Sequence, residues 1–224
     1  MCIKDEFQVR SIPPEQTHDW LKRKHYAKRV PQIQYAFGLY DMSLILQGVC
    51  TYGSPARMMN NGYGIFGGKY EVPTFELNRL VVNEGLPKNV LSFFVSQTFK
   101  MLPNPICLVS YADSNAGHHG YIYQATNWIF TGQTPPRKKF ITKDGKDVHE
   151  STITHKSKKE QEALLQDLII DEQEGKFRYL QFLGNRNDVK KMRSLLAYDV
   201  QPYPKGDNSR YDASYKPSTQ GSLF

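Results

Sequence analysis

The alternation of apolar and polar positions predicts a β-hairpin followed by a strand–helix–strand unit. Two β-rich runs, 35–40 and 44–52, are separated by a polar break and predict the hairpin. The runs 75–82 and 106–111 predict two more strands, and the continuous apolar character of the second is typical of a buried strand. Between them, apolar residues recur at helical spacing over 89–102, so we expect a helix there.

Shorter elements flank this central unit. The segment 14–24 has Pro13 and Pro14 at its start and ends in basic residues, which favours a short helix. A short helix is predicted at 120–125, and a strand begins at 128–131. The alternation of strands and helices over 75–131 therefore predicts an α/β unit. The glycine-rich segment 54–68 is predicted to be a long, mobile, functional loop.

The composition changes after Pro135 and Pro136. A polar helix at 157–170, a strand at 176–183 and a helix at 187–196 follow, and the last residues have few apolar positions. We therefore expect one domain over 1–224. Its predicted parts are a core at about 5–135, a C-terminal extension at 136–205 and a flexible tail at 206–224.

Composition excludes several classes of protein. Apolar residues make up 39% of the 224 residues and charged residues 23%, a globular balance. No run approaches the roughly 20 apolar residues of a membrane helix, and the first ten residues lack the features of a signal peptide. The three cysteines are widely spaced without a CxxC pair, which indicates a reducing compartment. We expect a cytoplasmic protein without a membrane partner.

The helix that follows strand 75–82 begins at a place where an anion can bind. Lys88, Asn89 and Ser92 stand at the start of helix 89–102, where unpaired N–H groups and the helix dipole attract phosphate. The alternative is an ordinary helix cap, because the sequence has neither a Walker pattern nor a GxGxxG pattern.

Polar residues also follow the buried strand 106–111, in the position where α/β proteins usually carry a site. Asp113 can act as a base or an orienting group, and Tyr123 as a proton donor. His118 and His119 could bind a metal, although adjacent side chains rarely point the same way. Within strand 75–82, Glu76 and Arg79 are three residues apart, so we expect them on opposite faces of the sheet.

The layout of 75–131 resembles the GNAT superfamily of acyltransferases, which have a central mixed β-sheet flanked by helices. The resemblance implies acetyl-CoA or a related acyl-CoA, with its pantetheine along the backbone of Leu80, Val81 and Val82. Its pyrophosphate would lie at Lys88, Asn89 and Ser92, and Tyr123 would be the general acid. The glycine-rich pyrophosphate signature is absent, and NEGLPKNVLS stands in its place.

A longer series of blocks resembles the Mom family of phage DNA-modification enzymes, which are GNAT-like. This resemblance implies addition of a carbamoylmethyl-type group to N6 of adenine in phage DNA, which then escapes host restriction enzymes. It covers about 20–205, with HYAKRVP (25–31), TYGSP (51–55), FELNRLVV (75–82), LSFFVS (91–96), LVSYADSNAGHHGYIYQATNW (108–128), TGQTPPRKK (131–139) and KFRYLQFLG (176–184).

The Mom resemblance also implies particular site residues. Expected catalytic residues are Arg79, Asp113 and Tyr123, joined by His25, Tyr26 and Glu76. Iron is a candidate cofactor, with His25, Glu76 and His118 as ligands. An extruded adenine needs a stacking partner, and the candidates are Tyr26, Tyr63, Phe66 and Trp128.

Double-stranded DNA is the partner that this function requires, and the net charge of +7 agrees with a polyanion. The expected phosphate contacts are Lys22, Arg23, Lys28, Arg29, Arg137, Lys138 and Lys139, and the basic run 156–159 is a further candidate. The location would be the cytoplasm of the bacterial host, and a homodimer is an option. Two alternatives stay open: a GNAT acetyltransferase for a small-molecule or protein amine, and a non-catalytic phage DNA-binding protein.

Overall fold

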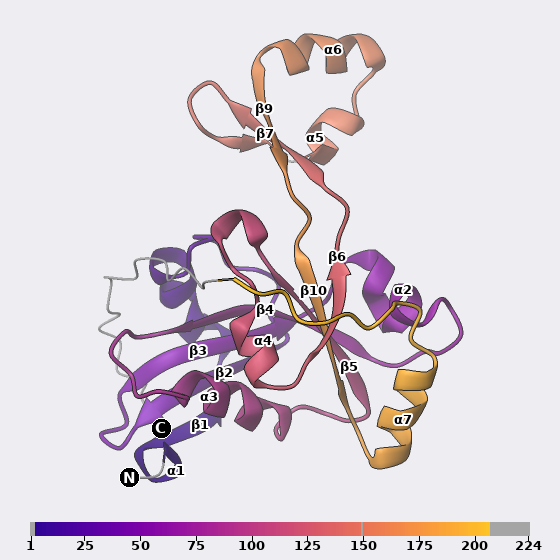
Figure 1. The fold of residues 1–224 in the computed structure, drawn as a ribbon. Coiled ribbons are helices and arrows are strands. Elements are labelled where there is room, and N and C mark those ends of the chain that lie inside the picture. The colour runs from indigo at the N-terminus through magenta and orange to yellow at the C-terminus, as the bar shows by residue number, and fades with distance from the viewer. Residues whose placement is uncertain (1–2, 149, 207–224) are drawn as a thin grey trace.

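A seven-stranded mixed sheet forms the centre of the protein in the computed structural model, which describes residues 3–148 and 150–206 (Figure 1). Five neighbouring strand pairs are antiparallel, and the pair β4–β5 is parallel. In spatial order the strands are β1 (Phe7–Ser11), β2 (Tyr35–Asp41), β3 (Leu46–Gly53), β4 (Thr74–Val82), β5 (Ile106–Ala112), β10 (Phe177–Leu183) and β6 (Ile129–Gln133).

Helices cover both faces of this sheet. On the first face, α3 (Val90–Phe99) and α4 (Tyr121–Ala125) pack against Leu108 and Tyr179. On the second face, α2 (Tyr63–Phe66) and α7 (Arg186–Ser194) pack against Val109 and Leu180. Outside residues 137–173, the remaining helical segments are α1 (Ile3–Glu6), η1 (Pro14–Thr17), η2 (Trp20–Lys24), η3 (Arg57–Gly62) and η4 (Ser114–Ala116).

Most predicted elements of the core are confirmed. The hairpin, the strands at 75–82 and 106–111 and the helix over 89–102 are β2–β3, β4, β5 and α3. The 14–24 helix consists of a 3₁₀ turn followed by a π-helical turn. The segment 54–68 is not an open loop, because it forms η3 and α2 and its Ile65 and Phe66 are fully buried.

A separate arm projects from the sheet (Figure 1). We use "the arm" for residues 137–173, which comprise β7 (Arg137–Thr142), β8 (Asp147–Val148), β9 (Leu168–Gln173), α5 (Glu150–Thr154) and α6 (Lys158–Gln166). The predicted helix 157–170 ends at Gln166, and its last part is β9, in which Ile169 and Ile170 pair with Ile141 and Phe140 of β7. β-branched residues favour this strand over a continued helix.

The chain returns from the arm into the main sheet. β10 lies between β5 and β6, so the segment 136–205, expected as an extension, supplies a central strand. The expected tail at 206–224 lies outside the described residues except for Gly206. The mixed central sheet flanked by helices, with a parallel β4–α3–β5 unit, is the GNAT-like architecture expected from the sequence. Within the described residues, no helix is long and apolar enough to cross a membrane.

Candidate active site

The parallel strands β4 and β5 separate at their carboxyl ends and form a fork. They pair only from Thr74 to Glu76 on β4, although β4 continues to Val82. Ser110 closes the fork, because its Oγ lies 2.7 Å from the carbonyl oxygen of Leu77 and 2.7 Å from the hydroxyl of Tyr123. A crevice outside the carboxyl ends of parallel strands is the usual position of a site in α/β proteins.

A β-bulge in β4 brings Glu76 and Arg79 to the same face of the sheet. Arg79 lies opposite Thr51 and Leu77 lies opposite Tyr52, so Asn78 is an extra residue in β4. The prediction that Glu76 and Arg79 face opposite sides is therefore wrong, because it assumed an uninterrupted two-residue alternation. Each of the two charges shifts the pKa of the other, as expected of neighbours on one face.

Seven side chains gather at this end of the sheet, and we call them the titratable cluster. The His25 and Tyr26 rings stack with centroids 4.5 Å apart, and the Tyr26 and His118 rings meet edge to face at 5.2 Å. Asp113 Oδ2 lies 2.8 Å from Lys176 Nζ. The members of the cluster are His25, Tyr26, Glu76, Arg79, Asp113, His118 and Lys176.

His25 is neutral in this environment. Burial lowers its pKa to about 3, helped by the charges of Arg79, His118 and Lys28. Its Nδ1 accepts the backbone N–H of Ala27 at 3.1 Å, so a neutral ring holds its proton on Nε2. His25 therefore presents a hydrogen-bond donor.

The two carboxyl groups of the cluster differ in electrostatics. Burial alone would raise the pKa of Asp113, but the hydrogen bond and charge of Lys176 outweigh it and hold the pKa below its ordinary value. Burial raises the pKa of Glu76, and the charges of Arg79 and Lys176 oppose that effect. Asp113 is thus the carboxyl group that is more readily ionised. Sequence reasoning missed Lys176, since nothing in a single sequence pairs it with Asp113.

Tyr123 points from α4 into the fork. Burial raises the pKa of its hydroxyl, and Tyr26 and Glu76 raise it further, so the hydroxyl keeps its proton at neutral pH. Its ring is held between Trp128, with centroids 5.1 Å apart, and Tyr179, at 4.9 Å. A protonated, rigidly held hydroxyl is suited to donate a proton.

The residues expected to bind a cofactor are found along the open part of β4 and at the start of α3. Leu80, Val81 and Val82 belong to the part of β4 beyond its last pairing with β5. Asn89 precedes α3 with a φ of 71° and no side-chain cap, and Ser92 Oγ donates to the Asn89 carbonyl at 3.0 Å. Lys88 is exposed beside them.

The expected iron site is not assembled. Within the described residues, no group of three or more His, Cys, Asp or Glu side chains is placed to hold a metal ion. The proposed ligands His25, Glu76 and His118 therefore do not fit iron as a set, and the Nδ1 of His25 is already used by Ala27. The physical reason is that the positive charges of Arg79 and Lys176 act on the Glu76 carboxylate and would repel a metal cation there.

The expected DNA contacts divide into two groups. Arg29 and Arg137 lie within electrostatic reach of the cluster, since both shift the pKa of Tyr26. Arg23 pairs with Asp19 at 2.8 Å, and Lys28 donates to the carbonyl of Arg23. Exposed Lys22 lies on η2, while Lys138 and Lys139 lie opposite Glu172 and Asp171 in the arm.

The prediction of base stacking is wrong for two of the four candidates. Phe66 and Trp128 are fully buried in the core, where no base can reach them. Tyr26 and Tyr63 are 39% and 63% exposed and stay candidates.

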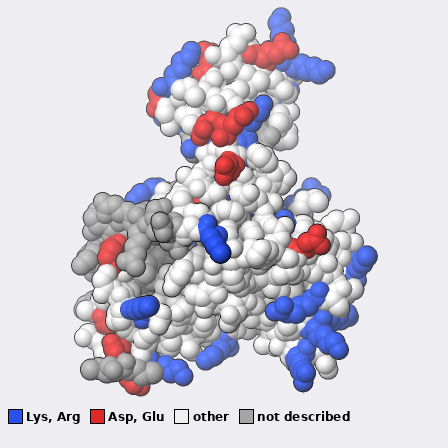
Figure 2. Space-filling model, in the orientation of Figure 1, with Lys and Arg blue, Asp and Glu red and all other residues white. Residues whose placement is uncertain are grey.

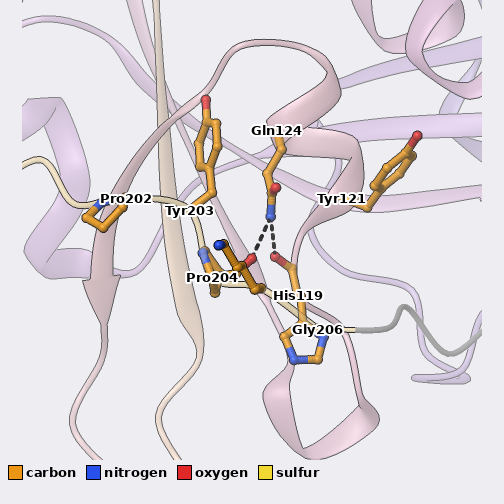
Figure 3. A pocket seen from close by; sticks show the side chains of 8 residues that line it. His119, Tyr121, Gln124, Pro202, Tyr203, Pro204 and Gly206 are labelled. Atoms are coloured by element: carbon orange, nitrogen blue, oxygen red, sulfur yellow. Dashed lines mark hydrogen bonds between the residues drawn. The ribbon is translucent and has the colours of Figure 1, made fainter.

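A separate hollow of about 550 Å³ lies between α4 and the segment 202–206 (Figure 3). Gln124 Nε2 donates to the carbonyls of His119 at 3.1 Å and Pro204 at 3.4 Å across it. The Tyr203 hydroxyl donates to the Trp128 carbonyl at 2.7 Å, which fastens this segment over the aromatic core. In the described part of the chain, the titratable cluster contributes no side chain to the lining of the hollow.

Protonation of His25 should lower stability at acidic pH. The pKa of His25 is about 3 in the folded chain and near 6.5 when unfolded, so the unfolded chain binds the extra proton between these values. Lowering the pH from 7.5 to 5 should therefore cost about 2 kcal/mol of unfolding free energy through this group. Urea unfolding at both pH values measures the loss, and His25→Gln should show a smaller one. Equal losses in the two proteins would contradict the prediction.

Together, the forked mixed sheet and the helices on both of its faces define a GNAT-like fold. The chain belongs to the Mom protein family, whose profile matches residues 6–205. It is 27% identical over 209 residues to methylcarbamoylase Mom of Escherichia phage Mu. The aligned region covers 89% of this chain and 84% of that relative.

Solved acetyltransferase structures are also similar to this chain. A GNAT-family acetyltransferase from Streptococcus pneumoniae has a TM-score of 0.45 at 8% identity, covering 80% of this chain and 100% of that one. NAA60 of Arabidopsis thaliana in complex with acetyl-CoA has a TM-score of 0.43 at 10% identity, covering 79% and 98%.

Proposed function

We propose that this chain is a DNA-modifying transferase that adds a carbamoylmethyl-type (methylcarbamoyl) group to N6 of adenine in phage DNA. The modified DNA is then protected from host restriction enzymes. The observation that carries the proposal is membership of the Mom family over 6–205, a span that includes the whole titratable cluster. The printed name of the phage Mu relative, methylcarbamoylase, supports the transferred group.

The reaction replaces an N6–H bond of adenine by a bond from N6 to the CH₂ carbon of the carbamoylmethyl group, and it breaks the bond from that carbon to its leaving group on the donor. N6 loses a proton, for which ionised Asp113 is the proposed acceptor, with Lys176 holding it in place. The leaving group takes the electron pair and a proton, for which the protonated hydroxyl of Tyr123 is the proposed donor. The charge of Arg79 and the Nε2 donor of His25 would orient the base.

Adenine N6 becomes accessible to this cluster only when the base leaves the duplex stack. The base would approach from the second face of the sheet, because Glu76 pairs with Val109 of that face and the bulge places Arg79 on the same side. Tyr26 and Tyr63 are the proposed stacking partners, because both expose aromatic surface. Arg29 and Arg137 would neutralise the phosphates on either side.

Acetyl-CoA or a related acyl-CoA is the proposed source of the transferred group. The residues fit it in two ways: Leu80–Val82 offer backbone beyond the last β4–β5 pairing, and Lys88, Asn89 and Ser92 lie at a helix start without a side-chain cap. When bound, such a donor would supply the incoming group. A carbamoylmethyl product requires a related acyl-CoA that carries its leaving group on the CH₂ carbon, because attack at the thioester carbonyl would give an N6-acyl product instead. Leu80 and Val82 pack with the core of the first face, so donor and DNA would approach from different faces.

Two further expectations belong to this proposal. The enzyme would act in the cytoplasm of the bacterial host, where phage DNA is replicated. A homodimer is the assembly compatible with a basic DNA enzyme, and light scattering of the purified protein would measure it.

Mass spectrometry of cellular DNA tests the proposed function. Plasmid from bacteria that express the chain is digested to nucleosides, with an Asp113→Ala culture as the control. We expect a heavier deoxyadenosine, with a carbamoylmethyl group in place of one hydrogen, only with the intact chain. Unmodified deoxyadenosine from cells that contain folded protein would overturn the proposal.

A further inference from the structure

Helix α7 carries a dense cluster of positive charge. Its nine residues include four basic side chains and a single acidic one, Asp188. Lys and Arg side chains gather over α7 in Figure 2, whereas the arm mixes both signs. The arm has eight basic and eight acidic residues, so the net positive charge of the protein resides elsewhere.

Three of these basic side chains form a stripe along one side of the helix. Arg186, Lys190 and Arg193 are spaced i, i+4 and i+7, and all three are exposed. The stripe is about 10 Å long at 1.5 Å per residue, close to three base-pair steps of duplex DNA. The other side of α7 packs Val189 and Met192 against the core.

The stripe has no acidic partner within the described residues. The side chain of Asp188 accepts the backbone N–H of Asn185 at 3.2 Å, so it is occupied in capping the helix. No ion pair in the described chain includes Arg186, Lys190 or Arg193. The positive charge of the stripe is therefore available to an external anion.

The stripe and the titratable cluster lie on the same face of the sheet. Val109 is the register partner of Glu76 and belongs to the same buried group as Met192 of α7. Lys176 precedes β10 and α7 follows it, so the two sites are separated by the length of this strand. A seven-residue strand spans about 23 Å, which is the length of roughly seven base pairs.

We infer that the α7 stripe is a second contact with DNA, which holds the phosphate backbone of the duplex about seven base pairs from the adenine at the titratable cluster. The inference rests on the proposed function for its partner. Three cationic side chains on one helix can contact successive phosphates of the DNA backbone. Such contacts increase the affinity for DNA but do not recognise its base sequence.

Binding of a duplex oligonucleotide by fluorescence anisotropy, measured across a salt series, tests this inference. The variant is Arg186→Gln/Lys190→Gln/Arg193→Gln. Each phosphate contact contributes about 0.9 to the slope of log K against log salt, so the slope should fall by up to about 3 and the affinity by about tenfold or more.

A matched control removes the same charge from the neutral arm. Lys156→Gln/Lys158→Gln/Lys159→Gln also replaces three exposed cations, and we expect it to bind DNA as the wild type does. Equal affinities and slopes for the two variants would overturn the inference, even if adenine is modified in cells. Circular dichroism of both variants verifies that each is folded.

The same proteins separate this inference from the proposed function. Deoxyadenosine that stays unmodified with the wild type, together with weaker DNA binding by the α7 variant only, would support the α7 contact and overturn the proposed reaction. Modified deoxyadenosine with equal DNA binding by all three proteins would support the proposed reaction and overturn the α7 contact.

Discussion

Replacing Tyr123 by Phe should lower the rate of DNA modification by about 10²- to 10⁴-fold, the usual range for loss of a general acid. The ring would keep its contacts with Trp128 and Tyr179, because only the hydroxyl is removed. Ser110 would keep its hydrogen bond with the Leu77 carbonyl. The fold should therefore persist while proton delivery at the fork is lost. The measurement is the initial rate of heavy deoxyadenosine formation by purified protein.

The neighbouring Tyr121 provides the control. It lies two residues away on the same helix, but it is 60% exposed and lines the hollow between α4 and the segment 202–206. Tyr121→Phe should leave the rate within a few-fold of the wild type. A rate for Tyr123→Phe as high as that of Tyr121→Phe would remove Tyr123 from the mechanism.

Trp128→Ala should destabilise the protein by about 3–5 kcal/mol, since it removes a fully buried indole and leaves a cavity. The ring packs against Phe99, with centroids 5.9 Å apart, and against Tyr123. For a chain of this size the melting temperature should fall by about 10–15 °C. Thermal unfolding followed by circular dichroism measures the change. A base-stacking residue would instead show an unchanged melting temperature and a lower rate of DNA modification.

Trp128→Phe separates lost packing from lost polarity. The indole Nε1 has no hydrogen-bond partner among the described residues, so replacing it costs no hydrogen bond. We expect this variant to lose less than half as much stability as Trp128→Ala. A loss as large as that of Trp128→Ala would indicate that the indole N–H has a partner and that ring packing is not the main contribution.

Local patterns were sufficient to predict the central elements of the fold. The helical spacing over 89–102 and the continuous apolar run 106–111 are α3 and β5 in the structure, because each depends on residues close in sequence. The ordered sequence blocks also predict membership of the Mom family, and the family match over 6–205 confirms that prediction.

Other features depend on contacts between distant residues, which periodicity does not report. The bulge at Asn78 depends on the register between β3 and β4, and it decides which face Glu76 takes. The pairing of Lys176 with Asp113 joins residues 63 positions apart. The burial of Phe66 and Trp128 depends on which elements cover them, so the sequence alone does not separate a base-stacking aromatic residue from a core one.

The fork in the central sheet also bears on the order in which the two substrates bind. If the donor lies on the side of α3 and α4 and the nucleic acid on the side of α2 and α7, neither ligand occupies the path of the other. The sheet then separates the two ligands, which would meet at the fork between β4 and β5, beside Ser110 and Tyr123. Either ligand could then enter first, and we expect transfer within a ternary complex without a covalent intermediate on the enzyme.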